Sequence, residues 1–248
     1  MSALGLDLAA GLSPVQFAAG LGFEAEQWQR ELLVSKARRQ VLNCSRQVGK
    51  TTTVAIKALH TAVYRRDALI LVFSPSQRQS DEMLLRIKSM YRTLGRAKAS
   101  KDSGSELLLE NGSRILSLPG TEGTSRGFAA ARLVILDEAA RVDDDIFASV
   151  LPMVASDGAL MALSTPWGRR GWFFELHQDV QNGWEKHKVT CYESGQYTPE
   201  RIAEMKSTVG SFTFASDYEC VFGDTDSQMF GTEIVRACMS DLIIPMEF

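Results

Sequence analysis

The chain has 248 residues, of which 45% are hydrophobic and 23% are charged, as is typical of a soluble globular protein. Its formal net charge of −3 argues against a protein that is basic throughout and binds nucleic acid with its whole surface. No apolar run approaches the roughly 18 residues of a membrane span, the amino terminus lacks a secretory pattern, and neither the four cysteines nor the three histidines show metal-ligand spacing. We expect a cytosolic protein with reduced thiols.

Strands and helices are predicted to alternate along most of the chain. An amphipathic helix around Gln29 comes before the first strand. Apolar runs predict buried strands over residues 41–45, 69–73, 133–136 and 160–163, and an alternating pattern predicts a strand over 184–190. Helices are expected over residues 50–64, 77–94, 143–155, 172–179, 199–207 and 212–220. Two further apolar runs flank Asn111-Gly112, a dipeptide favoured in tight hairpin turns.

This alternation predicts an α/β fold with a mainly parallel central sheet flanked by helices. Ligands of such sheets bind beyond the carboxyl ends of the strands. The polar motifs of this chain follow predicted strands at such ends.

The stretch 43-NCSRQVGKTTT-53 ends like the phosphate-binding pattern GxxxxGK[ST] but has Cys44 in place of its first glycine. It lies between a predicted strand and a predicted helix, where backbone N–H groups can bind a triphosphate. Lys50 would reach the β- and γ-phosphates, and the Thr51 hydroxyl would ligate Mg²⁺. The alternative is a chance GKT at the start of a helix. The predicted nucleotide-binding residues of the loop are Ser45, Arg46, Gln47, Val48, Gly49, Lys50, Thr51 and Thr52.

An acidic pair follows the apolar run in RLVILDEAARV. Asp137 is predicted to hold Mg²⁺, and Glu138 to orient and polarise the attacking water. The alternative is a solvated strand end, which a strand this apolar does not favour. Together with the GKT sequence, the pair predicts a nucleotide hydrolase.

Two further motifs are predicted to contact the nucleotide. In LSTPWG, Ser164 and Thr165 are expected to touch the γ-phosphate and a neighbouring segment, unless they only end the strand before Pro166. In EQWQRELL, the Gln29 amide can read the amino group and ring nitrogen of adenine, and Trp28 can stack or pack. This favours ATP over GTP.

In this order, the motifs resemble the ATPase domain of the large terminase subunit of tailed bacteriophages and herpesviruses. WQRELL is similar to the family's adenine motif, and CSRQVGKT to its Walker A sequence. LVILDEAARV is similar to its Walker B region, and STPWG to its coupling motif. FASDYECVF resembles the stretch that closes the motor domain, with Asp217 where the family usually has Glu. The resemblance covers most of the chain and implies a P-loop NTPase of the additional-strand, catalytic-glutamate type.

The resemblance also implies partners and a domain plan. Such motors couple ATP hydrolysis to translocation of double-stranded DNA into a preformed capsid. They act as a ring, usually of five subunits, with the portal protein and the small terminase subunit, in the host cytoplasm. We expect residues 1–222 to form the motor domain, with lid elements near 180–222. Residues 223–248 are expected to lead toward a separate nuclease domain, and this chain itself to lack nuclease activity.

Two arginines and one basic segment are candidates for further roles. Arg46 is predicted to contact the γ-phosphate in cis, or to pair with Glu138 when the site is empty. Arg126, in GTSRGF, is either an arginine finger that acts on a neighbouring subunit or an ordinary surface arginine. The basic segment 78–101 is the candidate surface for sequence-independent contact with DNA phosphates, or simply a solvated helix face.

Two other functions are compatible with an ATP site. A helicase-like translocase would separate DNA strands, but the sequence shows neither a second motor lobe nor a strand-splitting element. A non-hydrolysing nucleotide-binding scaffold of virion assembly would not need Lys50, Thr51, Asp137 and Glu138 together.

Overall fold

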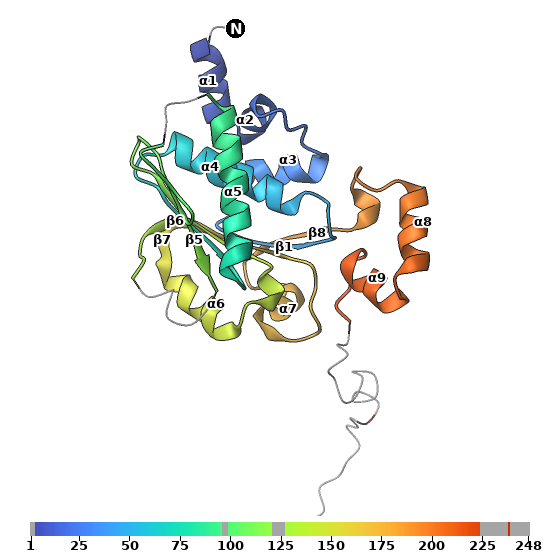
Figure 1. Ribbon diagram of the computed structural model, residues 1–248. Coiled ribbons are helices and arrows are strands. Elements are labelled where there is room, and N and C mark those ends of the chain that lie inside the picture. The colour runs from blue at the N-terminus through green and yellow to red at the C-terminus, as the bar shows by residue number, and fades with distance from the viewer. Residues whose placement is uncertain (1–2, 96–98, 121–126, 224–237, 239–248) are drawn as a thin grey trace, which may run out of the picture.

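The computed structural model describes residues 3–95, 99–120, 127–223 and 238 (Figure 1). Within them, one sheet has the strand order β3-β4-β5-β2-β6-β7-β1-β8. Strands β5, β2, β6, β7, β1 and β8 run parallel, whereas β4 is antiparallel to both β3 and β5. The predicted α/β fold with a mainly parallel sheet is therefore confirmed. The strands are β1 Arg39–Cys44, β2 Leu69–Ser74, β3 Lys101–Ser103, β4 Glu106–Leu108, β5 Arg114–Pro119, β6 Ala131–Asp137, β7 Val154–Ser164 and β8 Glu185–Val189.

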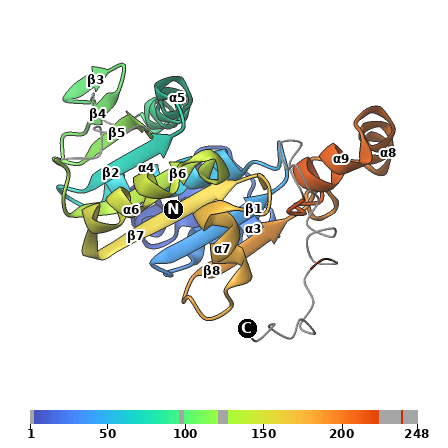
Figure 2. The same cartoon turned by 90° about the horizontal axis from the view of Figure 1, so that it is seen from below.

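Helices cover both faces of the sheet (Figures 1 and 2). Because successive side chains of a strand point to opposite faces, Ile70 and Val72 of β2 join the core under α2–α5, whereas Leu71 and Phe73 join the core under α6 and α7. None of the described helices is both long and apolar enough to cross a membrane. The helices are α1 Ala3–Leu12, α2 Pro14–Gly20, α3 Gln27–Val34, α4 Lys50–Tyr64, α5 Gln77–Thr93, α6 Asp144–Val150, α7 Gly171–Gln178, α8 Pro199–Thr208 and α9 Ser211–Asp217.

The predicted hairpin at Asn111-Gly112 joins β4 to β5. Gly112 has a φ of 82°, and its N–H donates to the Leu109 carbonyl at 3.1 Å. The Leu109 N–H in turn donates to the Ser113 carbonyl at 2.9 Å, so the loop is one residue longer than a two-residue turn. The Asn111 side chain also donates to the Ala62 carbonyl at 2.8 Å, which ties the hairpin to the end of α4.

The helix predicted over residues 143–155 is too long. Helix α6 ends at Val150, a 3-10 turn covers Leu151–Met153, and Val154 already begins β7. Pro152 explains the early end, because proline lacks the N–H that would continue the helix and its ring clashes with the preceding turn. Strand β7 is correspondingly longer than the predicted strand 160–163.

Helices α8 and α9 follow β8 and lie beside the carboxyl end of the sheet (Figure 1). This is the small helical part that the sequence predicted near residues 180–222. Helix α9 ends at Asp217, three residues earlier than expected. The proposed boundary at residue 222 stays a prediction, because nearly all of the predicted linker 223–248 lies outside the described residues.

Candidate nucleotide-binding site

The loop between β1 and α4 turns through two left-handed residues, and position 44 is not one of them. Cys44 is the last residue of β1, is fully buried and is not among the residues with positive φ. The left-handed conformations come later, at Gln47 with φ 57° and Gly49 with φ 89°. A Cβ on Gly49 would also lie 2.9 Å from Gln29 Nε2. Glycine is therefore required at position 49, whereas a side chain is accommodated at position 44.

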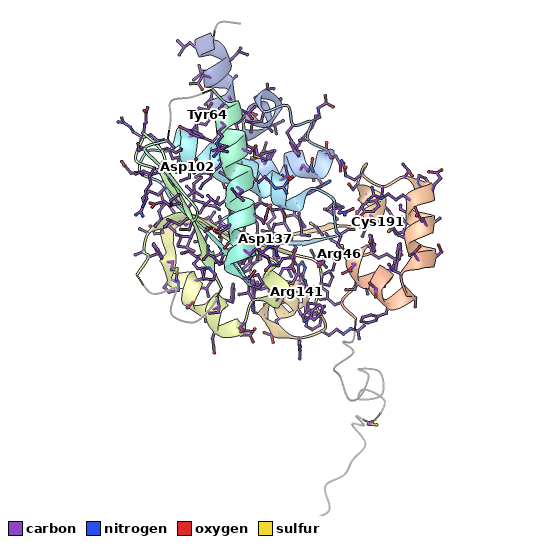
Figure 3. All side chains as sticks on the ribbon, viewed as in Figure 1. Arg46, Tyr64, Asp102, Asp137, Arg141 and Cys191 are labelled. Carbon is purple, nitrogen blue, oxygen red and sulfur yellow. The ribbon has the colours of Figure 1, made fainter. Side chains whose placement is uncertain are left out.

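The strand order brings the predicted motifs together. Strand β7 lies between β1 and β6, so an additional strand separates the phosphate loop from the acidic pair. In register, Ser164 of β7 is beside Asn43 of β1, and Leu163 is beside Asp137 of β6. Lys50, Asp137 and Ser164 thus stand at the carboxyl ends of three adjacent strands, where ligands of parallel sheets bind. Figure 3 shows Asp137, Arg46 and Arg141 near this end.

Asp137 is buried at this end, with 7% of its surface exposed. Burial, and secondarily the neighbouring Glu138 carboxylate, raise the pKa of Asp137 to about 6. Lys50, which is 8% exposed, opposes this rise and lowers the pKa of the same carboxyl. A buried carboxylate whose charged form is disfavoured is suited to a cation ligand. Cys44 is not a nucleophile here, because burial raises the pKa of its thiol to about 12.

Buried polar atoms near the site lack partners in the described part of the chain. Ser164 and Asn43 are 0% and 2% exposed, and neither Ser164 Oγ nor Asn43 Oδ1 has a hydrogen-bond partner there. An unsatisfied buried polar atom costs about 1–3 kcal/mol. Ser164 Oγ thus has unused hydrogen-bonding capacity near the carboxyl end of β7. Thr165 is also buried, at 2% exposure.

Glu138 has a partner that the sequence did not suggest. Its Oε2 lies 3.1 Å from Arg141 Nη1, and the Arg141 guanidinium stacks 4.3 Å from the centre of the Trp167 ring. A cavity of about 780 Å³ lies beside Arg141 and Trp167. The sequence held one signal for this ion pair, namely the three-residue spacing from Glu138 to Arg141. Trp167 follows directly after STP in the predicted coupling motif.

Arg46 pairs with Asp217 of α9 rather than with Glu138, and its predicted contact with the γ-phosphate stays a prediction. Its Nε lies 2.8 Å from Asp217 Oδ2 on α9, so the predicted pairing with Glu138 is absent from this structure. Its N–H donates to the Asp217 carbonyl at 3.0 Å, and its own carbonyl accepts from the Tyr197 hydroxyl at 2.8 Å. The next residue, Gln47, accepts from Arg201 Nη2 at 2.9 Å. Helices α8 and α9 are thus attached directly to the phosphate loop.

The predicted adenine motif contacts the phosphate loop through its glutamine. Gln29 is 4% exposed, its Oε1 accepts from the Glu26 N–H at 2.8 Å, and its Nε2 donates to the Val48 carbonyl at 3.4 Å. Trp28 donates to Glu26 Oε2 at 2.9 Å and packs against the core. Both polar atoms of the Gln29 amide are therefore engaged within the protein. Reading of adenine by Gln29 and Trp28 stays a prediction.

The remaining predicted site residues differ in how far the structure describes them. Thr51 is half-buried in the first turn of α4. Thr52 accepts a hydrogen bond from Arg86 of α5 at 2.9 Å, so its hydroxyl has a partner on α5. Val48 is fully buried, and Ser45 donates its N–H to the Val189 carbonyl at 2.8 Å. Arg126 lies outside the described residues.

The basic segment 78–101 is less available than its charge suggested. Lys88 is 3% exposed and pairs with Asp102 at 2.8 Å, and Arg92 pairs with the same carboxylate at 3.0 Å. Lys101 pairs with Glu106, and Arg86 is bonded to Thr52. These four cations are engaged within the protein, which weakens this segment as a DNA surface.

Solved structures of phage large terminases share this fold. The ATPase domain of the large terminase of Thermus phage P74-26 matches with a TM-score of 0.72 at 18% identity, over 84% of this chain and 97% of that chain. The large terminases of a thermophilic bacteriophage, in complex with ADP, and of bacteriophage HK97 match with TM-scores of 0.69 and 0.65, at 10% and 16% identity. Both matches cover 80% of this chain, but only 54% and 51% of those longer chains.

The family assignment comes from the sequence of the same region. Residues 41–236 match the family of terminase large subunits, T4likevirus-type, N-terminal. This span is well over half of the chain and contains the phosphate loop, the Asp137-Glu138 pair and the Ser164-Thr165 pair. The chain therefore belongs to the terminase large subunit family, and its fold is that of a phage large terminase ATPase domain.

Proposed function

We propose that this chain hydrolyses ATP with Mg²⁺ and couples the hydrolysis to translocation of double-stranded DNA into a procapsid. The observation that carries the proposal is the meeting of Lys50, Ser164 and the Asp137-Glu138 pair at the ends of three adjacent strands. That the large terminase of a thermophilic bacteriophage was solved in complex with ADP and with ATP-gamma-S supports a nucleotide as the ligand.

The residues at these strand ends fit a magnesium ion bound together with the phosphates. Mg²⁺ prefers hard oxygen ligands and is usually held by one or two protein groups plus phosphates. The Thr51 hydroxyl and the Asp137 carboxylate are such groups, and Asp137 is buried with a raised pKa that a cation would lower. When bound, the ion neutralises charge that develops on the transferred phosphoryl group.

The other catalytic and binding roles belong to side chains and backbone amides of this protein. Lys50 and the loop amides bind the β- and γ-phosphates. Glu138 orients the attacking water and accepts its proton, which requires its carboxylate to leave Arg141. Ser164 Oγ, which lacks a partner among the described residues, contacts the γ-phosphate and reports its loss through β7.

Three predicted contacts complete the proposal. Gln29 and Trp28 hold the adenine beside the phosphate loop, which selects ATP. Arg46 exchanges Asp217 for the γ-phosphate when ATP binds. Arg126 reaches the active site of a neighbouring subunit as an arginine finger.

The proposed assembly is a homo-oligomeric ring, expected to be a pentamer, at the portal of a procapsid in the host cytoplasm. The portal protein and the small terminase subunit are its expected partners. DNA is held through its phosphates without sequence preference, because packaging has to proceed along any sequence.

Steady-state ATPase measurements on the wild type, Glu138→Gln and Lys50→Ala test the hydrolytic role. We expect Glu138→Gln to lower kcat about 10²–10⁴-fold, as for loss of a general base, while ATP binding is retained. Glu204→Gln, on the exposed face of α8, is the matched control and should be unchanged. A wild type without ATPase activity would support the scaffold instead. Strand separation during translocation would support the helicase-like translocase.

A further inference from the structure

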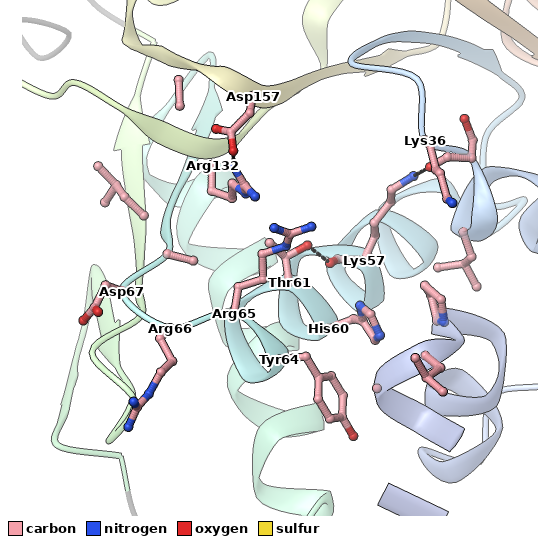
Figure 4. Close-up of a pocket in the computed structure, with 18 of the residues that line it drawn as sticks. Lys36, Lys57, His60, Thr61, Tyr64, Arg65, Arg66, Asp67, Arg132 and Asp157 are labelled. Atoms are coloured by element: carbon pink, nitrogen blue, oxygen red, sulfur yellow. Dashed lines mark hydrogen bonds and ion pairs between the residues drawn. The ribbon is translucent and has the colours of Figure 1, made fainter. Parts of the chain in front are cut away.

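A second cavity, of about 950 Å³, lies at the amino-terminal end of the strands, where β2, β6 and β7 begin (Figure 4). We call it the basic cavity. The ends of α1, α3 and α4 complete its walls. Helix α4 starts at Lys50 and ends beside this cavity, and its 15 residues span about 22 Å at 1.5 Å per residue. The basic cavity is thus one helix length from the phosphate loop.

Positive charge predominates around the basic cavity, although the whole chain has a net charge of −3. Its lining includes five lysine and arginine side chains but only two carboxylates, Asp67 and Asp157. The five cations are Lys36, Lys57, Arg65, Arg66 and Arg132. Such a local excess attracts anions irrespective of the sign of the total charge.

Two of the five cations are already engaged. Lys57 donates to the Leu32 carbonyl at 2.7 Å and to the Ser35 carbonyl at 3.0 Å, so it neutralises the carboxyl end of α3. Arg132 forms an ion pair with Asp157. Lys36, Arg65 and Arg66 are exposed and make no ion pair within the described part of the chain. In Figure 4, Arg65 lies between Arg132 and Lys57, whereas Arg66 points outward.

The chemistry of the lining suits phosphate groups. Arginine binds phosphate oxygens through two parallel N–H groups, and lysine acts as a point charge. Among the described residues, the lining contains neither Asn nor Gln, whose amides read adenine edges. Leu12 and Val34, which are 79% and 54% exposed, offer apolar contact to sugars at the rim.

We propose that the basic cavity binds backbone phosphates of double-stranded DNA through Lys36, Arg65 and Arg66. The proposal rests on the proposed function, because it supplies the DNA contact that a packaging motor requires. The basic cavity thus replaces segment 78–101 as the candidate DNA surface. In that segment, the engaged cations are Arg86, Lys88, Arg92 and Lys101.

Binding of a labelled DNA duplex of ~30 base pairs, about three helical turns, tests the assignment by fluorescence anisotropy over a series of salt concentrations. Wild type is compared with Arg65→Ala/Arg66→Ala and with the matched control Arg78→Ala, an exposed arginine on α5. Each lost phosphate contact should reduce the slope of log K against log salt by about 1, so we expect a reduction of about 2 in the double variant. The control should retain the wild-type slope. ATPase activity without DNA should be unchanged in both variants.

Several results would overturn the proposal. These are a wild type that binds no duplex even at low salt, a double variant with the wild-type slope, and an equal loss in Arg78→Ala. Binding of a polyglutamate peptide through Arg65 and Arg66, without binding of duplex, would assign the cavity to an acidic protein partner instead. Arg65→Lys/Arg66→Lys should restore most of the slope, which separates lost charge from misfolding. Absence of ATPase activity in the wild type would refute the proposed function, whereas the salt slopes decide the DNA site independently.

Discussion

Glu138 has a left-handed backbone, with φ 52° and ψ 40°, and its carboxylate is held 3.1 Å from Arg141. A non-glycine residue in this conformation is uncommon, and such residues concentrate at functional sites. The same Arg141 stacks on Trp167, which follows the Ser164-Thr165 pair. The pairing therefore connects the proposed catalytic carboxylate to the segment that would respond to the γ-phosphate.

Replacement of Arg141 by alanine should raise the basal ATPase rate. Glu138 has to leave Arg141 before it can orient water. A partly exposed ion pair of this kind is worth about 0.4–1 kcal/mol, so its removal should increase kcat about 2–5-fold. Steady-state kinetics, with KM and kcat measured separately, check this. Arg141→Lys should behave almost like wild type, and a lower kcat in Arg141→Ala would contradict the interpretation.

The buried Asp137 carboxyl makes the nucleotide-free protein less stable as pH rises. Its folded pKa of about 6 is above the unfolded value of about 3.9, so the unfolded state releases this proton first. The contribution of the protonated form to stability is complete below pH ~4 and is lost as pH rises to ~6. At pH 7.5, Asp137→Asn should therefore increase the free energy of unfolding, by at most about 3 kcal/mol.

Urea unfolding of the two proteins at pH 4 and pH 7.5 measures this difference. The gain of Asp137→Asn should be small at the lower pH, where Asp137 is protonated in the folded protein. Mg²⁺-dependent nucleotide affinity should decline in the wild type below pH ~6, because a metal ligand has to be deprotonated. Equal stabilisation at both pH values would show that the effect is not titration of this carboxyl.

At the scale of elements, sequence patterns predicted most of the sheet and left its long-range contacts open. Apolar runs identified β2 and β6, because a strand buried on both faces leaves a continuous apolar signature. The attachment of α8 and α9 to the phosphate loop had no such signature, since Arg46, Tyr197 and Asp217 are far apart in the sequence. Counting charges likewise overestimated how much positive charge of α5 is free to bind a ligand, because Lys88 pairs with Asp102 on a different element.

Removal of the Tyr197 hydroxyl should loosen α8 and α9. Tyr197 is 7% exposed and donates to the Arg46 carbonyl at 2.8 Å. In Tyr197→Phe this carbonyl keeps only the Ser45 hydroxyl as a donor, at 3.3 Å, so we expect a cost of about 0.5–1.5 kcal/mol. Hydrogen exchange should accelerate in α8, α9 and residues 45–49 but not in β2 or β6. Tyr192→Phe is the matched control, because its hydroxyl bonds to Glu219 at the surface, and it should change little. Equal exchange in both variants would contradict this attachment.

At the scale of the whole molecule, α4 connects the candidate nucleotide site to the basic cavity. Its first turn carries Lys50 beside the acidic pair, and its last residue precedes Arg65 in the basic cavity. Sequence alone predicted the candidate nucleotide site, because its residues form short contiguous motifs. It did not locate the basic cavity, whose cations come from the ends of α3 and α4 and the start of β6, and meet only in the folded chain.

The proposed ring predicts a catalytic contact between neighbouring subunits. If Arg126 acts on a neighbouring active site, Arg126→Ala should lower the ATPase rate of the assembled protein by about 10³–10⁵-fold. Arg126→Ala and Glu138→Gln should each be inactive alone, and their mixture should regain activity. In the mixture, a subunit with an intact Glu138 can receive the arginine of its neighbour. The specific rate of wild type should likewise rise with protein concentration. A mixture that stays inactive, together with a concentration-independent wild-type rate, would place Arg126 outside the catalytic machinery of the neighbour.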